Sequence, residues 1–325
     1  MIYTVTFNPA IDCVMQCDGM STGAVNRASA QTFYFGGKGV NVSVVLSHLG
    51  RKSCALGFTA GWTGAALEEA LREDGIESGF VRLENGQTRV NMKLKGTVAP
   101  GPDGVGGTGD EEVETAVNAP GPVVGEGKFA AFFEKIEQVE KGDFLILSGG
   151  LLPGMPVDTY ARIMDELDGR GARIVVDATG ETLTSALPHK PFLVKPNDEE
   201  LAEIAGCAED DLDALKEAAF DLQRKGAQNV LVSRGGKGSF LVCETGELLE
   251  APVIKGALVN SVGAGDSVVA GFVEGYLRAE ESGESGVVAC ERAYRLAQAC
   301  GSATAFSPGL APIELVEQLL AQLEA

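Results

Sequence analysis

One acidic side chain stands directly behind a run of small residues in the last quarter of the chain. Residues 260–271 read NSVGAGDSVVAG, which places Gly263, Ala264 and Gly265 immediately before Asp266 and an apolar helix pattern after it. Small residues let consecutive backbone N–H groups converge at a helix start, where unpaired donors and the helix dipole favour an anion. The position of Asp266 is therefore consistent with two roles, a general base beside an anion hole or an ordinary helix cap. The two glycines, which a cap does not require, favour the catalytic interpretation.

A second glycine-rich motif, with a lysine inside it, opens another helix pattern near residue 40. The segment from Gly36 reads GGKGVNV, and the apolar pattern that follows ends at Gly50. The motif is not a Walker A phosphate loop, because Lys38 is followed by Gly39 instead of Ser or Thr. GGKGS at residues 235–239 fails the same test. On its own, GGKG also fits a plain turn.

Residues 96–127 have the composition of an exposed loop, since they are rich in Gly, Pro and acidic residues and contain no Lys or Arg before residue 128. The stretch contains a match to GxGxxG at Gly104, Gly106 and Gly109. We reject this match as a dinucleotide site, because no hydrophobic strand leads into it and no helix opens from it.

The motifs need an α/β framework to position them, and the remaining sequence predicts one. Short apolar runs alternate with amphipathic helix patterns over most of the 325 residues, which indicates a mostly parallel sheet covered by helices on both faces. Residues 88–95, TRVNMKLK, instead alternate apolar and polar side chains, as in a half-exposed strand. We therefore expect a single domain, 1–325, with a small β-sheet lid whose strands come from about 10–35 and 88–125.

The composition argues against several classes of protein. The chain has 26 Lys and Arg against 46 Asp and Glu, a net charge of −20, which makes nucleic acid and anionic membranes poor partners. Its seven cysteines include no CxxC pair, and its two histidines argue against His-ligated zinc and a Ser-His-Asp triad. The sequence shows no signal-peptide pattern and no apolar stretch long enough for a membrane span, so we expect a cytoplasmic protein.

Both glycine motifs resemble the two signatures of the PfkB (ribokinase-like) carbohydrate kinase family, GGKGVNV in the first third and VGAGDSVVAG in the last. Further segments are similar to the 1-phosphofructokinase branch of that family, namely TFNPAID, TRVNMKLK, ETAVNAPGP, PFLVKPNDEEL and GSATAFS. The resemblance runs in order from Met1 to about Pro308. It implies a ribokinase-like three-layer sandwich with a mostly parallel central sheet and a small β-sheet lid.

The resemblance implies transfer of the γ-phosphoryl group of MgATP to a sugar hydroxyl. Asp266 would accept the proton of the attacking hydroxyl, while backbone N–H groups of residues 262–265 stabilise charge on the transferring group. Asp12 would accept hydrogen bonds from the sugar, although an Asx-turn also explains an Asp after the first strand. For Arg89, simple solvation is the alternative to binding a phosphate. The expected substrate-binding residues are Asp12, Arg27, Gly37, Lys38, Asn41, Arg89 and Ser148.

The resemblance also implies a nucleotide and metal end of the site. Asn197 and Glu200 match the N-x-x-E element of the family, which holds Mg²⁺ and its waters near the phosphates. The adenine is expected between residues 253–261 and 299–303. The expected nucleotide-binding residues are Lys195, Ser233, Gly235, Val253, Ser261, Val262, Gly263, Gly265 and Ser302.

Two departures from the family pattern affect these assignments. Where the family commonly shows SGSLP, residues 148–153 read SGGLLP, so Gly150 lacks a hydroxyl that is often found at that position. The Gly-rich acidic stretch before Glu114 is also longer than the usual connection in the lid, and surface loops tolerate such insertions at small cost.

The sequence thus predicts an ATP-dependent kinase that converts fructose 1-phosphate to fructose 1,6-bisphosphate. Tagatose-6-phosphate kinase and the minor form of 6-phosphofructokinase are alternatives in the same class, and a non-catalytic sugar-phosphate sensor is the alternative of another class. The expected partners are a sugar phosphate and ATP, with no nucleic acid and no membrane. Because an exposed lid sheet offers a face that a twofold partner can cover, a homodimer through the lid is a possible assembly.

Overall fold

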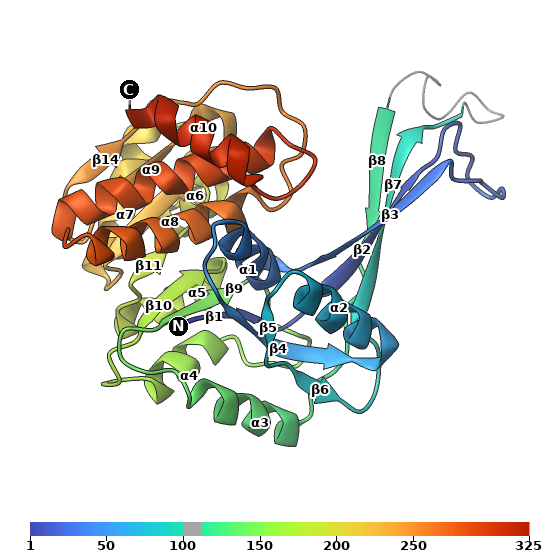
Figure 1. The fold of residues 1–325 in the computed structure, drawn as a ribbon, viewed down its shortest axis with the longest axis horizontal. Helices are drawn as coiled ribbons and strands as arrows, with labels where there is room; N and C mark the ends of the chain where they lie inside the picture. The colour runs from blue at the N-terminus through green and yellow to red at the C-terminus, as the bar shows by residue number, and fades with distance from the viewer. Residues whose placement is uncertain (100–111, 325) are drawn as a thin grey trace.

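A large central sheet forms the body of the protein, and the computed structural model describes residues 1–99 and 112–324 of it (Figure 1). The strands of this sheet are β1 (Ile2–Thr6), β4 (Cys54–Ala60), β5 (Glu77–Ser78), β6 (Val81–Leu83), β9 (Phe144–Ser148), β10 (Arg173–Asp177), β11 (Leu193–Val194), β12 (Asn229–Ser233), β13 (Ser239–Val242) and β14 (Leu248–Glu250). Their order is β14-β13-β12-β11-β10-β9-β1-β4-β5, with β6 paired to β4. All pairs are parallel except those that β13 makes with β12 and β14.

The central strands are short and almost uniformly apolar, which explains their position in the interior. Every residue of β1 and β9 is buried, as expected where helices cover both faces of a parallel sheet. The carboxyl ends of β1, β9, β10, β11 and β12 all lie at one edge of the sheet, because these strands are mutually parallel.

Two helical layers enclose the sheet, and each has its own apolar core. One face packs against α1 (Lys38–His48), α8 (Ala264–Glu281), α9 (Gly286–Ala305) and α10 (Ile313–Glu324). The other face packs against α3 (Glu126–Ile136), α4 (Thr159–Glu166), α5 (Gly180–Ala186), α6 (Asp198–Ala205) and α7 (Leu212–Arg224). Helix α2 (Gly61–Glu73) packs with α1 in a smaller cluster beside β4 and β5. The predicted α/β sandwich with a mostly parallel sheet is confirmed.

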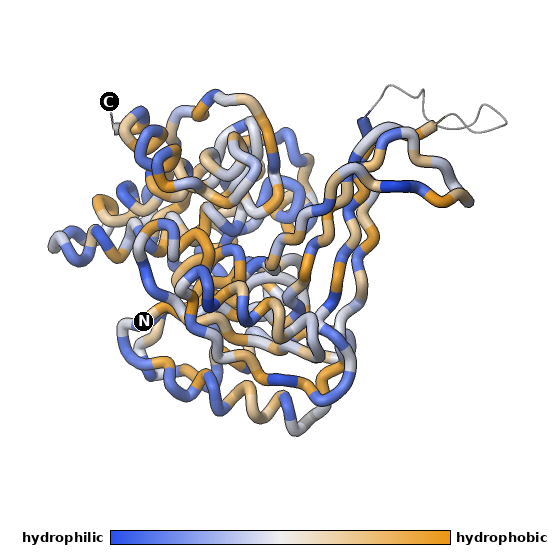
Figure 2. Tube along the Cα trace, turned by 45° about the vertical axis from the view of Figure 1, so that its right-hand side comes forward, coloured by the Kyte–Doolittle hydropathy of each residue, from blue (hydrophilic) through white to orange (hydrophobic). Residues whose placement is uncertain are grey.

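A second sheet of four strands extends away from the body as a lid (Figure 1). Its strands are β2 (Ala10–Gln16), β3 (Ala30–Gly36), β7 (Arg89–Thr97) and β8 (Glu112–Val117), in the order β3-β2-β7-β8. Apolar residues recur along these strands (Figure 2), and Phe33, Tyr34 and Val117 are exposed. The lid therefore presents apolar side chains to solvent.

Residues 96–127 do not form one loop: residues 96–97 end β7, residues 112–117 form β8 and residues 126–127 begin α3. Strand β8 lies within the range 88–125 from which lid strands were expected. Its alternation of Val113, Thr115 and Val117 with other residues lets it pair antiparallel with β7, despite the acidic and Gly-rich composition around it. The rejected GxGxxG match at Gly104, Gly106 and Gly109 lies outside the described residues.

Within the described part of the chain, no helix combines the length and the apolar character that crossing a membrane requires.

Glycines let α8 and α9 pack at very short range. A Cβ atom on Gly271 would lie 2.7 Å from the carbonyl oxygen of Leu296, and one on Gly275 would lie 2.7 Å from Cα of Ala293. Backbone atoms cannot move aside as a flexible side chain can, so these positions have no room for a methyl group. The close contact matters for the site, because α8 carries Asp266 in its first turn.

We expect Gly271→Ala and Gly275→Ala each to lower the free energy of unfolding by about 1–3 kcal/mol through overpacking. Urea unfolding followed by circular dichroism measures this change. Gly127→Ala in α3 is the matched control, since a Cβ there meets no atom within 4 Å, and it should be neutral or stabilising by up to about 1 kcal/mol. Equal losses in all three variants would contradict the packing argument.

Candidate active site

Asp266 is buried in the first turn of α8 and faces another helix. The side chain is 5% exposed, and its Oδ2 accepts a 2.7 Å hydrogen bond from Asn41 Nδ2. The helix begins at Ala264, and its N-cap residue Gly263 has φ of 81°, a conformation that glycine adopts without strain. The bond to Asn41 shows that the carboxylate is turned toward α1 instead of capping its own helix.

Helix α1 begins behind the first glycine motif and brings Asn41 to the same point. Its N-cap residue Gly37 has φ of 128°. A Cβ atom on Gly39 would lie 2.6 Å from the carbonyl oxygen of Val5, so glycine is required for the helix to start this close to β1. The starts of α1 and α8 therefore converge, and the GGKG segment is a helix start rather than a plain turn.

Asp177, at the carboxyl end of β10, is a residue of this cluster that the sequence analysis missed. It is 1% exposed, and its carboxylate oxygens lie 3.3 Å from Nζ of Lys38 and 3.3 Å from Nζ of Lys195. Nζ of Lys195 would also lie 3.3 Å from a Cβ on Gly265, so this ammonium stands beside the amides that begin α8. The available signal was an Asp ending a buried strand, where open α/β sheets bind ligands.

A second polar cluster lies on the lid, around Asp12. This residue sits inside β2, so the Asx-turn interpretation does not apply. Its Oδ1 accepts a 2.8 Å hydrogen bond from Asn91 Nδ2, and its Oδ2 lies 2.8 Å from Lys93 Nζ. Asn91 and Lys93 come from the neighbouring strand β7 and were not predicted as site residues, although the alternation of TRVNMKLK places both on the face that carries Arg89.

Two buried polar atoms of residues predicted to bind substrate have no hydrogen-bond partner among residues 1–99 and 112–324. They are Nε of Arg89 and Oγ of Ser148. Such atoms lose their bonds to water on folding and gain none in return, so they favour a bound ligand. Arg27, by contrast, lies in the exposed segment between β2 and β3, where its carbonyl oxygen accepts from Cys17 Sγ. The structure does not bring the Arg27 side chain into either cluster.

The residues predicted for the nucleotide occupy neighbouring strand ends and the segment that follows. Ser233 ends β12 and forms an isolated bridge with Asn197, and Gly235 begins the 3₁₀ turn η2 (Gly235–Lys237). The predicted residues Val253, Ser261 and Val262 belong to segment 251–263, and backbone bonds join this segment to Ala305, three residues beyond Ser302 on α9. A Cβ atom on Gly238, directly after η2, would lie 3.0 Å from Val253 Cγ2, so this turn lies against segment 251–263.

Asn197 and Glu200, the predicted metal residues, form a capping box at the start of α6. Asn197 Oδ1 accepts from the Glu200 backbone N–H at 2.7 Å, and Glu200 Oε2 accepts from the Asn197 backbone N–H at 2.9 Å. One carboxylate oxygen of Glu200, Oε1, is not used by this box. Glu200 also lies near enough to Lys38 for its charge to favour the ammonium form.

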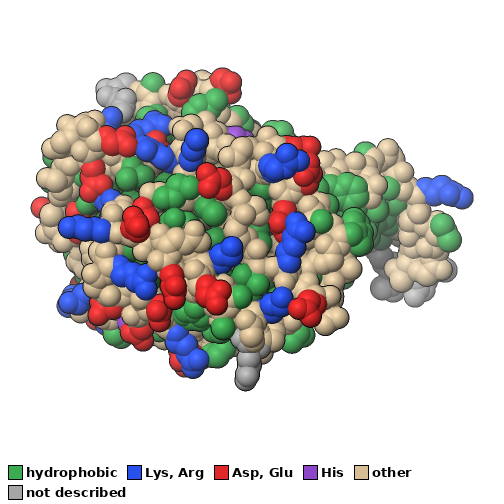
Figure 3. Space-filling model, turned by 60° about the horizontal axis from the view of Figure 1, so that its bottom comes forward, with side chains coloured by type: hydrophobic (Ala, Val, Ile, Leu, Met, Phe, Trp, Pro, Cys, Tyr) green, Lys and Arg blue, Asp and Glu red, His purple; other side chains and the backbone are tan. Residues whose placement is uncertain are grey.

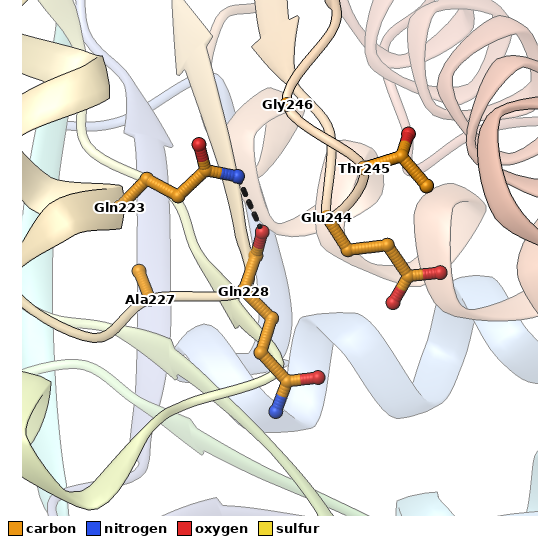
Figure 4. A pocket seen from close by; sticks show the side chains of 6 residues that line it. All are labelled: Gln223, Ala227, Gln228, Glu244, Thr245 and Gly246. Carbon is orange, nitrogen blue, oxygen red and sulfur yellow. Dashed lines mark hydrogen bonds between the residues drawn. The ribbon is translucent and has the colours of Figure 1, made fainter.

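A pocket of about 460 Å³ lies elsewhere, at the opposite edge of the sheet. It is bordered by the residues that precede β12 and by the turn after β13, and Gln223 Nε2 donates across it to the carbonyl oxygen of Gln228 at 3.1 Å (Figure 4). Because ligands of parallel sheets bind at the carboxyl ends of the strands, this pocket is separate from the candidate active site. Its lining residues are Gln223, Ala227, Gln228, Glu244, Thr245 and Gly246.

Comparison with known proteins identifies the family. The chain matches the model of the pfkB family of carbohydrate kinases over residues 5–315. It belongs to this family. The kinase is 40% identical over 324 residues to a Bacillus subtilis protein named 1-phosphofructokinase, across 100% of this chain and 99% of that protein. It is 33% identical to a Bacillus licheniformis protein named D-tagatose-1-phosphate kinase, across 100% and 99% of the two chains.

The fold of this carbohydrate kinase agrees with a solved structure over its whole length. Phosphofructokinase-2 from Escherichia coli, in complex with substrates and products, superposes with a TM-score of 0.83 at 27% sequence identity. The match covers 100% of this chain and 99% of that one. The parallel sheet with a separate small sheet is therefore an arrangement that the two proteins share.

The electrostatics around Asp266 suit a kinase base. Burial raises the pKa of Asp266 to about 6, and the charge of Asp177 adds to the rise, while the Asn41 hydrogen bond and the two lysines oppose it. Burial alone would raise the pKa of Asp177 too, but the charges of Lys195 and Lys38 hold it below its usual range. A general base works best when its pKa is near the working pH, so Asp266, not Asp177, has the properties of a base.

The acid limb of the activity profile should follow the pKa of Asp266. Since only the ionised carboxylate accepts a proton, kcat/KM should fall as the pH drops through about 6. Asp177→Asn removes a negative neighbour and should move this limb to lower pH. Asn41→Leu removes a hydrogen bond to the carboxylate and should move it to higher pH.

The pH dependence of kcat/KM for the two variants and the wild type measures both shifts, with thermal unfolding as the check that each variant is folded. Shifts in the same direction would refute the assignment of the limb to Asp266.

Proposed function

We propose that this kinase transfers the γ-phosphoryl group of ATP to the 6-hydroxyl of fructose 1-phosphate, giving fructose 1,6-bisphosphate and ADP. The observation that carries the proposal is the position of Asp266, a buried carboxylate of raised pKa behind the amides that begin α8. The 1-phosphofructokinase of Bacillus subtilis, which is 40% identical over the full length, supports the choice of substrate.

In the proposed reaction Asp266 takes the proton of the 6-hydroxyl as its oxygen attacks the γ-phosphorus. The bond from that phosphorus to the bridging oxygen breaks, and ADP leaves. Negative charge on the transferring group faces the N–H groups of residues 262–265 and the ammonium of Lys195, which stand together at the helix start. Phosphoryl transfer depends mainly on such positioning and charge stabilisation.

The lid cluster would hold the sugar phosphate. Asp12 and Asn91 offer an acceptor and a donor to the sugar hydroxyls, and Arg89 offers its unpartnered Nε to an anion. Ser148, whose hydroxyl is buried and unpartnered, would bond to the sugar from the body side. Gly37, Lys38 and Asn41 remain proposed substrate contacts, and Asn41 also bonds to Asp266, whereas the exposed Arg27 lies outside both clusters of this chain.

We propose Mg²⁺ as the metal that accompanies ATP. Within residues 1–99 and 112–324, no cluster of three acidic, His or Cys residues could hold a metal by itself. The donors present are a carboxylate oxygen of Glu200 and the amide of Asn197. This set fits Mg²⁺, which keeps several waters and binds through one or two carboxylates and the substrate phosphates. The ion would offset phosphate charge during transfer.

Tagatose 1-phosphate is the second candidate substrate, because the Bacillus licheniformis relative is named D-tagatose-1-phosphate kinase. Both candidates carry the phosphate on carbon 1 and present a free 6-hydroxyl, and the two sugars differ in configuration at one carbon. Fructose 6-phosphate and tagatose 6-phosphate carry the phosphate at the other end of the sugar. The named relatives therefore favour a 1-phosphate over either 6-phosphate.

The remaining proposals concern assembly and location. A non-catalytic sensor is not favoured, since the chain belongs to a kinase family and since the proposed base Asp266 is buried against Asn41, with Lys195 paired to Asp177 nearby. The exposed Phe33, Tyr34 and Val117 of the lid support a homodimer through that sheet. We propose a cytoplasmic location, in keeping with small phosphorylated metabolites as substrates.

Side-by-side kinetics with four sugar phosphates test the proposed function. We expect the highest kcat/KM, measured as ADP release, for fructose 1-phosphate, then tagatose 1-phosphate, with fructose 6-phosphate and tagatose 6-phosphate far lower. The two 6-phosphates can offer the base only their 1-hydroxyl, with the phosphate and the ring reversed between the lid and Asp266. The order of the four substrates therefore shows which orientation the site accepts. A preference for either 6-phosphate would overturn the substrate, and sugar-phosphate binding without ADP release would restore the sensor interpretation.

A further inference from the structure

Lys93 projects from the lid into the same polar cluster as Asp12. Its ammonium lies 2.8 Å from Asp12 Oδ2, and its side chain is only 16% exposed. The β2–β7 register sets Asp12 opposite Asn91 and Val14 opposite Lys93. Side chains two residues apart on a strand share a face, so Lys93 lies on the face that holds Arg89 and Asn91.

The lid cluster holds more positive than negative charge. Arg89 and Lys93 each contribute one positive charge, whereas Asp12 contributes one negative charge, in a chain whose net charge is −20. Burial lowers the pKa of Arg89, the charge of Asp12 only partly opposes this, and Arg89 Nε has no partner. Because Asp12 is, among the described residues, the one carboxylate that balances two partly buried cations, and an incompletely balanced buried charge is costly, the cluster is suited to receive an added anion.

Lys38, the lysine expected near the sugar's phosphate, lies at the start of α1 on the body and not on the lid. Its ammonium is paired with Asp177 at 3.3 Å and belongs to the catalytic cluster. Lys38 therefore faces the site from the body, whereas on the lid itself Lys93, which reaches Asp12, is a second cation beside Arg89.

We propose that Lys93 determines specificity for a sugar phosphate over an unphosphorylated sugar, by moving its ammonium from Asp12 to the substrate phosphate when substrate binds. This inference rests on the proposed function. The move would free Asp12 Oδ2 to accept a bond from a sugar hydroxyl. Asn91 would stay in place, because its Oδ1 accepts from the Ala119 backbone N–H at 3.2 Å and this bond fixes the orientation of the amide.

Lys95 provides a matched control on the same strand and the same face. It is two residues beyond Lys93 and pairs with Glu114 of β8 at 3.1 Å, where both side chains are far more exposed. Lys93→Gln and Lys95→Gln therefore remove the same charge from neighbouring positions, and only the first touches Asp12.

Steady-state kinetics with fructose 1-phosphate and with fructose test the inference. Lys93→Gln should raise KM for fructose 1-phosphate about 10- to 100-fold, the loss of one charge-assisted bond, and should change kcat/KM for fructose little. Lys93→Arg should recover most of the affinity, and Lys95→Gln should resemble the wild type. Equal losses with both sugars, or equal effects of the two Gln variants, would overturn the role of Lys93.

Calorimetric titration with fructose 1-phosphate separates this inference from the proposed function. If the wild type binds the sugar phosphate without turnover, the proposed reaction fails, but titration of Lys93→Gln still tests the role of Lys93. Weaker binding by this variant supports the role, and unchanged binding refutes it. If the wild type binds neither fructose 1-phosphate nor tagatose 1-phosphate, both fail. Thermal unfolding of each variant confirms that the protein titrated is folded.

Discussion

The structure depends on the balance of charge around two buried carboxylates. Asp177 and Asp266 are both nearly fully buried, and two lysines, Lys38 and Lys195, lie around them. Removing one partner from such a group leaves a buried charge unpaired, which is far more costly than losing a surface ion pair. The four residues come from α1, α8, the end of β10 and the segment after β11. The fold must therefore form for these charges to meet, and the paired charges in turn stabilise the contact between these elements.

This local balance explains how so acidic a chain can handle anionic substrates. Basic and acidic side chains are interspersed on the face seen in Figure 3, and ions in solution screen distant charges beyond roughly 8 Å. What an arriving phosphate meets is therefore set by the nearest groups. On the lid the cations Arg89 and Lys93 outnumber the carboxylate of Asp12, and at the start of α8 amides and Lys195 stand together.

The sequence predicted the structure best at positions where the backbone geometry admits only glycine. The glycines around Lys38 and before Asp266 predicted two helix starts, and both have the positive φ or the close approach that glycine allows. The alternation of TRVNMKLK predicted a lid strand. Asp177 was missed because its partners are distant in sequence. Strand β8 lies inside the 88–125 range expected to supply lid strands, but its loop-like composition concealed its position, because pairing with β7 outweighs composition. The reach of Lys93 to Asp12 depends on the register of two strands, which no local pattern determines.

Single-turnover phosphoryl transfer by Asp266→Asn tests the central claim most directly. The amide keeps the shape of the side chain and can still accept the bond from Asn41, but it cannot take a proton. The account predicts a fall of about 10²- to 10⁴-fold in the rate of transfer, with binding of fructose 1-phosphate and ATP nearly unchanged. A variant that transfers at close to the wild-type rate, or that loses rate only in proportion to lost binding, would show that Asp266 is not the base.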